Sequence, residues 1–151
     1  MRIEYLADFP EYLHTVNNWT YEEWGHLSPK TKEERLNDLK GRLNKNMIPL
    51  TFIALKGDKP VGTASIFKYD METHKHLSPW LAAVFVDPEH RREGIGSRLV
   101  KRILKKADNL GYKTLYLFTP DMMNFYRQLG WKEKEIVNYK NMEVTIMEYN
   151  F

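Results

Sequence analysis

The most constraining feature of the sequence is the junction between residues 80 and 111. Residues 80–86 (WLAAVFV) are almost wholly apolar, as expected of a strand buried on both faces. This run ends at Asp87-Pro88 and is followed by a loop with two glycines. Residues 95–110 then carry apolar side chains at helical spacing until Gly111, which is typical of a helix end. A buried strand followed by an amphipathic helix requires a sheet with helices packed on it, so the chain is predicted to be an α/β protein.

The remaining residues continue the alternation without a repeat or a linker, in the order β-α-α-β-β-β-α-β-α-β-β, which predicts a mixed sheet. Two helix starts have side-chain signals. Thr31 and Glu34 form a capping box, and Thr119-Pro120-Asp121 supplies an N-cap and a first-turn proline. Strands are expected at 3–6, 50–55, 60–69, 80–86, 114–118, 133–139 and 143–149, and helices at 10–18, 31–44, 95–110 and from the cap at 119 to about 129.

Length and composition favour one folded domain over residues 1–151. The chain is 42% hydrophobic and 28% charged, which is enough for one core and typical of globular proteins. It has no cysteine, which excludes a disulfide framework and is compatible with a cytoplasmic location. No apolar stretch is long enough to span a membrane, and the first residues (MRIEYLADFPEY) lack the apolar run of a signal peptide. We therefore expect no membrane partner.

The loop before the helix expected at residues 95–110 favours a phosphate ligand. Gly94 and Gly96 have no Cβ, so a pyrophosphate can approach the main chain closely. The N-terminus of the following helix directs unpaired N–H groups and a positive dipole end at the same place. A P-loop would need a Gly-Lys-Ser/Thr ending, which is absent, and a dinucleotide fingerprint would need a glycine where Leu99 stands. Neither familiar phosphate loop fits.

The pattern Arg91-x-x-Gly94-x-Gly96 resembles the acetyl-CoA loop of the GNAT superfamily of N-acetyltransferases, Gln/Arg-x-x-Gly-x-Gly/Ala. Residues 125–131 (FYRQLGW) resemble the second signature of that family on the next helix, and the order of elements is similar over the whole chain. The resemblance implies a GNAT-like fold, with a mixed, mostly antiparallel sheet flanked by helices and splayed central strands. It also implies acetyl-CoA as co-substrate and no metal.

The same resemblance implies a set of site residues. Val84 and Val86 would offer main-chain groups to the pantetheine arm, and Tyr126 would lie beside the CoA sulfur. Many members carry an asparagine about seven residues before that tyrosine, where this chain has Thr119, and Asn124 is the predicted substitute. The pyrophosphate would be held by the N–H groups of Arg91, Arg92, Glu93, Gly94, Ile95, Gly96 and Ser97.

Positive charge gathers at this junction. The net charge of the chain is +3, but residues 91–106 contain one acid and seven cations: Arg91, Arg92, Arg98, Lys101, Arg102, Lys105 and Lys106. A helical wheel places the five helix cations opposite the apolar face, as a solvated basic surface. We interpret this patch as the seat of the pyrophosphate and the 3′-phosphate of CoA. A nucleic-acid partner is disfavoured because no known binding motif accompanies the charge.

Acetyl transfer needs a neutral amine and a proton for the leaving thiolate. Tyr126 is the predicted general acid, because a phenol with a pKa near 10 can share its proton with a thiol near 8.5. Glu72 and His74 are the candidate general bases, in a segment that also holds Asp70 and His76. The two histidines lack a third ligand at a fitting spacing, so no metal site is predicted and exposed loop histidines are expected.

The sequence therefore predicts an N-acetyltransferase that transfers the acetyl group to a primary amine of a small molecule by direct attack in a ternary complex. Two alternatives stay open: a peptide or protein N-terminus as the acceptor, and a sensor that binds acyl-CoA without transferring the acyl group. A homodimer is also left open. The aromatic side chains of Trp19, Tyr21 and Trp24 either line an acceptor pocket or pack in the core, and the sequence does not decide between these.

Overall fold

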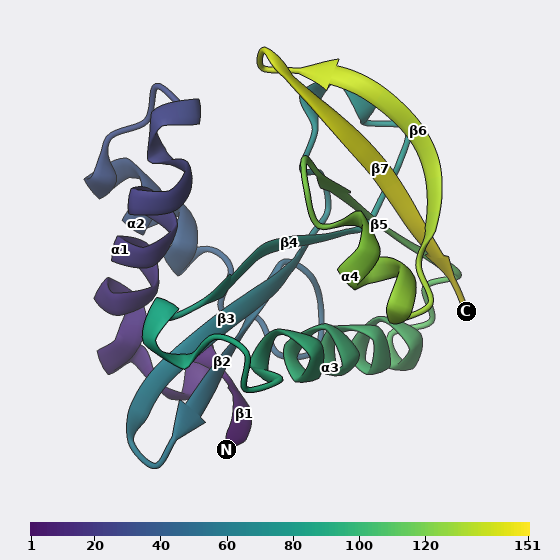
Figure 1. Ribbon diagram of the computed structural model, residues 1–151. Helices are drawn as coiled ribbons and strands as arrows, with labels where there is room; N and C mark the ends of the chain where they lie inside the picture. Colours follow the sequence, from purple (N-terminus) through teal and green to yellow (C-terminus); the bar gives the residue numbers. More distant parts are fainter.

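A computed structural model describes all residues, 1–151, and shows a seven-stranded sheet in the order β1-β2-β3-β4-β5-β7-β6 (Figure 1). The helices are α1 (Leu13–Trp24), α2 (Lys32–Lys40), α3 (Ile95–Asn109) and α4 (Met123–Gln128), and none of them has the length and apolar character needed to cross a bilayer. The strands are β1 (Arg2–Tyr5), β2 (Leu50–Lys56), β3 (Lys59–Phe67), β4 (Trp80–Val86), β5 (Thr114–Thr119), β6 (Lys132–Tyr139) and β7 (Met142–Asn150). The predicted α/β class and order of helices and strands are confirmed.

The sheet is antiparallel except between β4 and β5, which run parallel. These two strands are joined by a single residue pair, Trp80 with Tyr116, and they diverge beyond it. β4 also carries a bulge, because its residues Ala83 and Val84 stand opposite Ala64 of β3. The predicted mixed, mostly antiparallel sheet with splayed central strands is confirmed.

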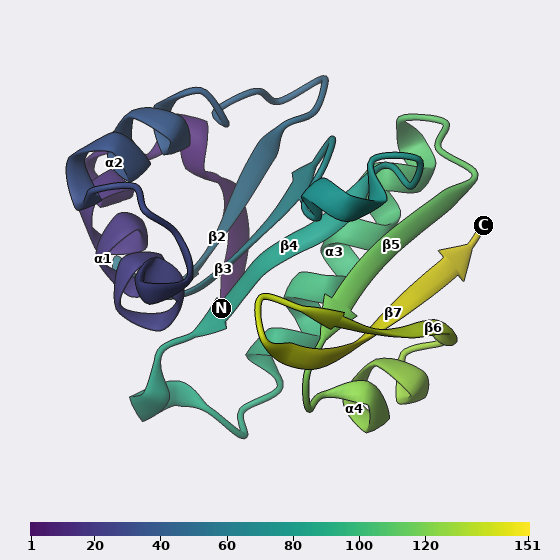
Figure 2. The same cartoon turned by 90° about the horizontal axis from the view of Figure 1, so that it is seen from above.

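Helices cover both faces of the sheet (Figures 1 and 2). α3 and α4 pack on one face over the largest apolar cluster, which includes Phe52, Leu99 and Ile103. α1 and α2 pack on the other face, over Ile53 and Leu55 of β2. A third cluster around Trp80 lies on that same face, between β5, β7 and the loop that follows β3. On this face, β4 therefore runs between α1 and α2 on one side and the cluster around Trp80 on the other (Figure 1).

Several helix ends differ from the expectation. The segment from Pro10 begins as a 3-10 turn, and α1 then continues to Trp24 through the aromatic residues. The capping box of Thr31 and Glu34 is confirmed, with N···O distances of 3.0 and 3.1 Å, but α2 ends before Gly41. The prediction that Thr119 caps a helix is wrong. Thr119 is still the last residue of β5, paired with β7, and its hydroxyl holds a turn that delays α4 to Met123.

Candidate active site

The edge of β4 that faces β5 has no strand partner beyond Trp80. Val84 and Val86 lie on this stretch, and their side chains pack toward the core between the sheet and α3. Ala83, at the bulge, has a φ of 54°, a left-handed conformation that is costly for a residue with a Cβ atom. Apart from the carbonyl of Val86, which accepts a hydrogen bond from Arg91, the main-chain groups on this edge of β4 have no strand partner and are placed to bind an extended ligand between β4 and β5, much as they would bind an added strand.

The first turn of α3 also has unpaired main-chain groups. Its N-cap residue, Gly94, has a φ of 80°, and no side chain caps the helix. The N–H groups of Ile95, Gly96 and Ser97 have no hydrogen-bond partner in the protein. A Cβ atom on Gly94 would meet nothing within 4 Å, so the space in front of the loop is open. This is the geometry of an anion site at a helix N-terminus, and it fits a pyrophosphate.

Two arginines stand at this loop. The Nε–H of Arg91 donates to the carbonyl of Val86 at 3.1 Å, and its guanidinium lies 5.6 Å from the centre of the Phe85 ring. Arg92 is exposed and has a φ of 66°. The carboxylate of Glu93, in the same loop, accepts a hydrogen bond from Lys56. The unpaired N–H groups and the two guanidinium groups together make the loop attractive to phosphate oxygens.

Tyr126 lies on α4 in the same apolar cluster as Ile95 of α3, and 8% of the residue is exposed. Its ring packs against Phe125 and Trp131, with ring centres 5.0 and 6.0 Å away. Its hydroxyl makes no hydrogen bond within the protein and is not fully enclosed. Burial raises the pKa of Tyr126 to about 12, so the hydroxyl stays protonated at any physiological pH and is available as a donor.

A model of the acetyltransferase (GNAT) family matches residues 10–131. The chain belongs to the GNAT family. Human N-acetyltransferase 8 is 33% identical to it over 86 residues, which are 54% of this chain and 38% of that protein. The chain therefore spans well under two thirds of the length of this relative.

Solved structures of GNAT proteins share the fold at low identity. An aminoglycoside 6′-N-acetyltransferase complexed with coenzyme A superimposes with a TM-score of 0.80 at 16% identity, over 99% of this chain and 97% of that chain. A ribosomal-protein-alanine N-acetyltransferase from Brucella melitensis gives a TM-score of 0.75 at 19% identity, over the whole of both chains. These likenesses show that the fold is shared over almost the whole chain.

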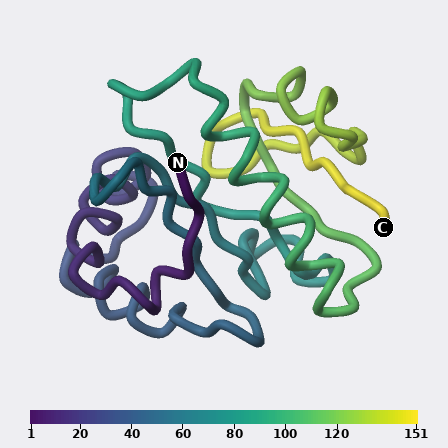
Figure 3. The backbone as a smooth tube through the Cα atoms, turned by 90° about the horizontal axis from the view of Figure 1, so that it is seen from below, coloured from purple at the N-terminus to yellow at the C-terminus, as the bar shows by residue number.

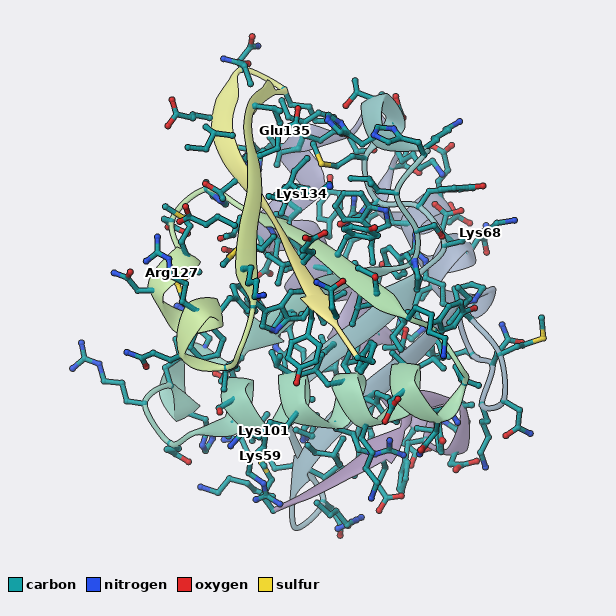
Figure 4. All side chains as sticks on the ribbon, turned by 90° about the vertical axis from the view of Figure 1, so that its right-hand side faces the viewer. Lys59, Lys68, Lys101, Arg127, Lys134 and Glu135 are labelled. Carbon is teal, nitrogen blue, oxygen red and sulfur yellow. The ribbon has the colours of Figure 1, made fainter.

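Within this GNAT fold, the two polar residues predicted near the cofactor differ in environment. Thr119 is buried, and its hydroxyl oxygen accepts the N–H of Met122 at 3.0 Å. Asn124 is exposed, and its side-chain oxygen accepts a hydrogen bond from Arg127, which also pairs with Glu133. Figure 4 shows Arg127 on the outer side of α4. A cofactor contact for either residue stays a prediction, and Asn124 would first have to leave Arg127.

The two predicted bases lie in a 3-10 turn, Glu72–His74, between β3 and β4. Glu72 is exposed and forms no ion pair. The ring of His74 is 3.6 Å from the carboxylate of Glu135 on β6 and 2.8 Å from the hydroxyl of Thr73, and 13% of its side chain is exposed. The expectation of an exposed loop histidine is thus wrong for His74, because β6 packs over it. The centre of its ring lies 5.6 Å from that of His76, with the two rings tilted by 31°, and no third metal-binding side chain joins the pair.

Asp70, which the sequence did not single out from its neighbours, has the most perturbed carboxylate of this segment. Burial raises the pKa of Asp70 to about 6, and the nearby charges of Arg42 and Lys140 offset only part of that shift. Arg42 is itself stacked on Phe67, with its guanidinium 4.1 Å from the ring centre. A carboxylate with a pKa near 6 is well matched to proton transfer near neutral pH. The only sequence signal was its position directly after a predicted strand.

We expect Asp70→Asn to change the pH dependence of stability. Because the folded state holds the Asp70 proton more tightly than the unfolded state, Asp70 favours folding below pH 4 and loses this contribution as the pH rises through about 6. The variant should therefore gain on the order of 1–2 kcal/mol in unfolding free energy, relative to the natural protein, between pH 4.5 and pH 8. Urea unfolding at both pH values measures this. Asp58→Asn, at a carboxylate that is 99% exposed, is the control, and a pH-independent difference for Asp70→Asn would contradict the assignment.

Two of the three aromatic residues of α1 form a platform beside β4. Trp19 stacks on Phe85 at 5.5 Å, and Trp24 meets the same ring edge-on at 6.4 Å. Both indoles are half-buried. Tyr21 instead packs against Gly25, where an added Cβ atom would lie only 2.8 Å from the ring. Trp19 and Trp24, but not Tyr21, therefore present aromatic surface near the β4 bulge on the face opposite α3.

The basic face of α3 is not uniformly solvated, contrary to the prediction. Lys106 is 8% exposed and donates to the hydroxyl of Tyr5 at 2.8 Å, and the Arg102 guanidinium lies 4.4 Å from the ring centre of Phe52. These contacts arise because β1 packs beside α3 (Figure 3). A hollow of about 420 Å³ on this side is lined by Ile3, Arg98, Lys101, Arg102 and Lys105. The cations beyond the first turn of α3 therefore lie toward β1. The single phosphate patch expected over residues 91–106 is thus divided into the loop before α3 and a separate basic surface beside β1.

Proposed function

We propose that this protein transfers the acetyl group of acetyl-CoA to a primary amine of a small molecule, by direct attack in a ternary complex. One observation carries the proposal: the uncapped first turn of α3 lies against both the unpaired end of β4 and α4, because a Cβ atom on Gly96 would be 3.6 Å from Val86 and 3.6 Å from Phe125, the neighbour of Tyr126. The main chain at Val84 and Val86 would bind the pantetheine arm by strand-like hydrogen bonds. The N–H groups of Ile95, Gly96 and Ser97 would bind the pyrophosphate.

Groups around the splay between β4 and β5 would assist the individual steps of acetyl transfer. The amine nitrogen attacks the thioester carbonyl carbon, so that a C–N bond forms and the C–S bond then breaks. Main-chain N–H groups at the β4 bulge would stabilise the negative charge on the carbonyl oxygen. Tyr126 would give a proton to the leaving sulfur, since burial raises the pKa of a thiol as well as that of a phenol. The chain has no cysteine, so no acetyl-cysteine intermediate can form.

A base must take the proton that the amine nitrogen loses. Glu72 and His74 remain the proposed candidates, and the raised pKa of Asp70 adds a third. The variants Glu72→Gln, His74→Asn and Asp70→Asn separate them through the pH dependence of kcat. Loss of the acidic limb in one variant identifies the base, because that limb reports protonation of the group that accepts the proton. A retained limb in all three variants would point to water or to a free amine that needs no base.

The acceptor is proposed to be a small molecule because the aromatic platform of Trp19 and Trp24 offers flat apolar surface of the kind that small-ligand sites use. The structural similarity to an aminoglycoside acetyltransferase supports this class, whereas the similarity to a ribosomal-protein-alanine acetyltransferase keeps a peptide N-terminus as the second candidate. Release of free CoA thiol should be measured with aminoglycosides, amino acids and short peptides. Preference for peptides would overturn the small-molecule acceptor. Thermal stabilisation by CoA without thiol release for any amine would favour the sensor.

A further inference from the structure

The loop that leads into α3 is tied to the turn between β2 and β3, and both lie at the lower left of Figure 1. Lys56, the last residue of β2, has its ammonium 2.7 Å from the carboxylate of Glu93. Lys59, at the start of β3, lies 3.8 Å from Glu89. Asp87 at the start of the loop donates its N–H to the main chain of β3 at 2.9 Å. The phosphate loop is thus held by a neighbouring hairpin as well as by β4 and α3.

Glu93 is the acid that directly precedes Gly94 and the unpaired N–H groups. The hydrogen bond from Lys56 holds the pKa of Glu93 below its ordinary value, so the carboxylate is ionised at neutral pH. Its other oxygen is 3.4 Å from Nδ1 of His90, in the same loop. An ionised carboxylate beside a pyrophosphate site would repel the ligand unless a cation compensates it. Lys56 is the only lysine or arginine that contacts this carboxylate.

We propose that Lys56 is a positioning residue for acetyl-CoA, which cancels the charge of Glu93 and fixes the loop of residues 91–97 for the pyrophosphate. The inference rests on the proposed function only in that CoA must bind at the first turn of α3, and it is independent of the acceptor. Glu93 contributes its main chain to the loop, while its side chain is committed to Lys56.

The test is the dissociation constant of CoA, measured by calorimetry. Lys56→Met leaves Glu93 charged and without its lysine partner, and we expect it to raise Kd about five- to tenfold. Glu93→Gln leaves a free cation near the pyrophosphate and should bind CoA as tightly as the natural protein or more tightly. The double variant Lys56→Met/Glu93→Gln should recover to within about threefold, because no uncompensated charge remains. Lys56→Arg should bind normally.

Salt separates this charge effect from a merely structural one. The ratio of Kd values between Lys56→Met and the natural protein should shrink when salt is raised from about 0.05 to about 0.5 M, because the affected charges are exposed and are screened. Lys59→Met removes a lysine from the same turn whose partner is farther away, and it is the matched control, expected to change Kd less than about twofold.

The results that would overturn the proposal are distinct. A Kd unchanged in Lys56→Met, a Glu93→Gln variant that binds more weakly, or a double variant as weak as Lys56→Met would each contradict the role of Lys56. Glu93→Gln and Lys56→Arg decide the matter even where Lys56→Met fails to fold. If the natural protein itself does not bind CoA, the proposed function fails and this inference with it. Binding by the natural protein with unaffected variants contradicts the inference alone.

Discussion

Tyr126→Phe is expected to lower kcat about a hundredfold and to leave the Kd of CoA nearly unchanged, because the hydroxyl is proposed to act on the leaving sulfur. Its loss should cost little stability, since the hydroxyl has no hydrogen-bond partner within the protein. With a pKa of about 12, Tyr126 does not titrate between pH 6 and pH 10. The loss of kcat should therefore have the same size across that range. Thiol release at saturating acetyl-CoA, followed from pH 6 to pH 10, measures it.

Tyr149→Phe is the matched control for this prediction. Tyr149 contacts Trp131 at 5.7 Å, in the same aromatic group as Tyr126, but on the side of β7. Removing its hydroxyl should leave kcat within about twofold. An unchanged kcat in Tyr126→Phe would exclude the general-acid role, and equal losses in both variants would show that the effect comes from aromatic packing and not from proton donation.

The architecture could be predicted from the sequence because its strongest patterns are local. The apolar run of β4, the capping box at Thr31 and the amphipathic spacing of α3 each report on a single element. The position of Gly94 also follows from local chemistry, because a left-handed N-cap favours glycine and the space in front of it is open. Gly96 instead lies against Val86 and Phe125, each 3.6 Å from where a Cβ atom would stand. These are the residues around which the candidate site is built.

The remaining features depend on contacts between distant segments. Lys106 is buried because Tyr5, 101 residues earlier, places its hydroxyl 2.8 Å away. The helical wheel of α3 contains no information on β1. The Lys56–Glu93 pair and the raised pKa of Asp70 likewise come from neighbours that are remote in sequence. For Thr119, ladder pairing with Thr145 of β7 prevailed over a good local capping signal.

Gly94→Ala is expected to weaken CoA binding about thirtyfold and to lower the unfolding free energy by about 1–2 kcal/mol. Two separate causes act. The φ of 80° is unfavourable for any residue with a Cβ atom, which destabilises the free protein. The added methyl group would also occupy the open space in front of the first turn of α3, where the pyrophosphate is proposed to lie. Calorimetric titration with CoA and urea unfolding measure the two effects independently.

Gly111→Ala separates these causes, because it repeats the strain at the other end of α3. Gly111 has a φ of 88°, and a Cβ atom there would also meet nothing within 4 Å. Both variants should therefore lose a similar amount of stability, since both force alanine into the left-handed region. Only Gly94→Ala should lose affinity for CoA. Equal CoA affinity in the two variants would mean that the ligand does not approach the main chain at Gly94, and the pyrophosphate would have to be placed elsewhere than at the N-terminus of α3.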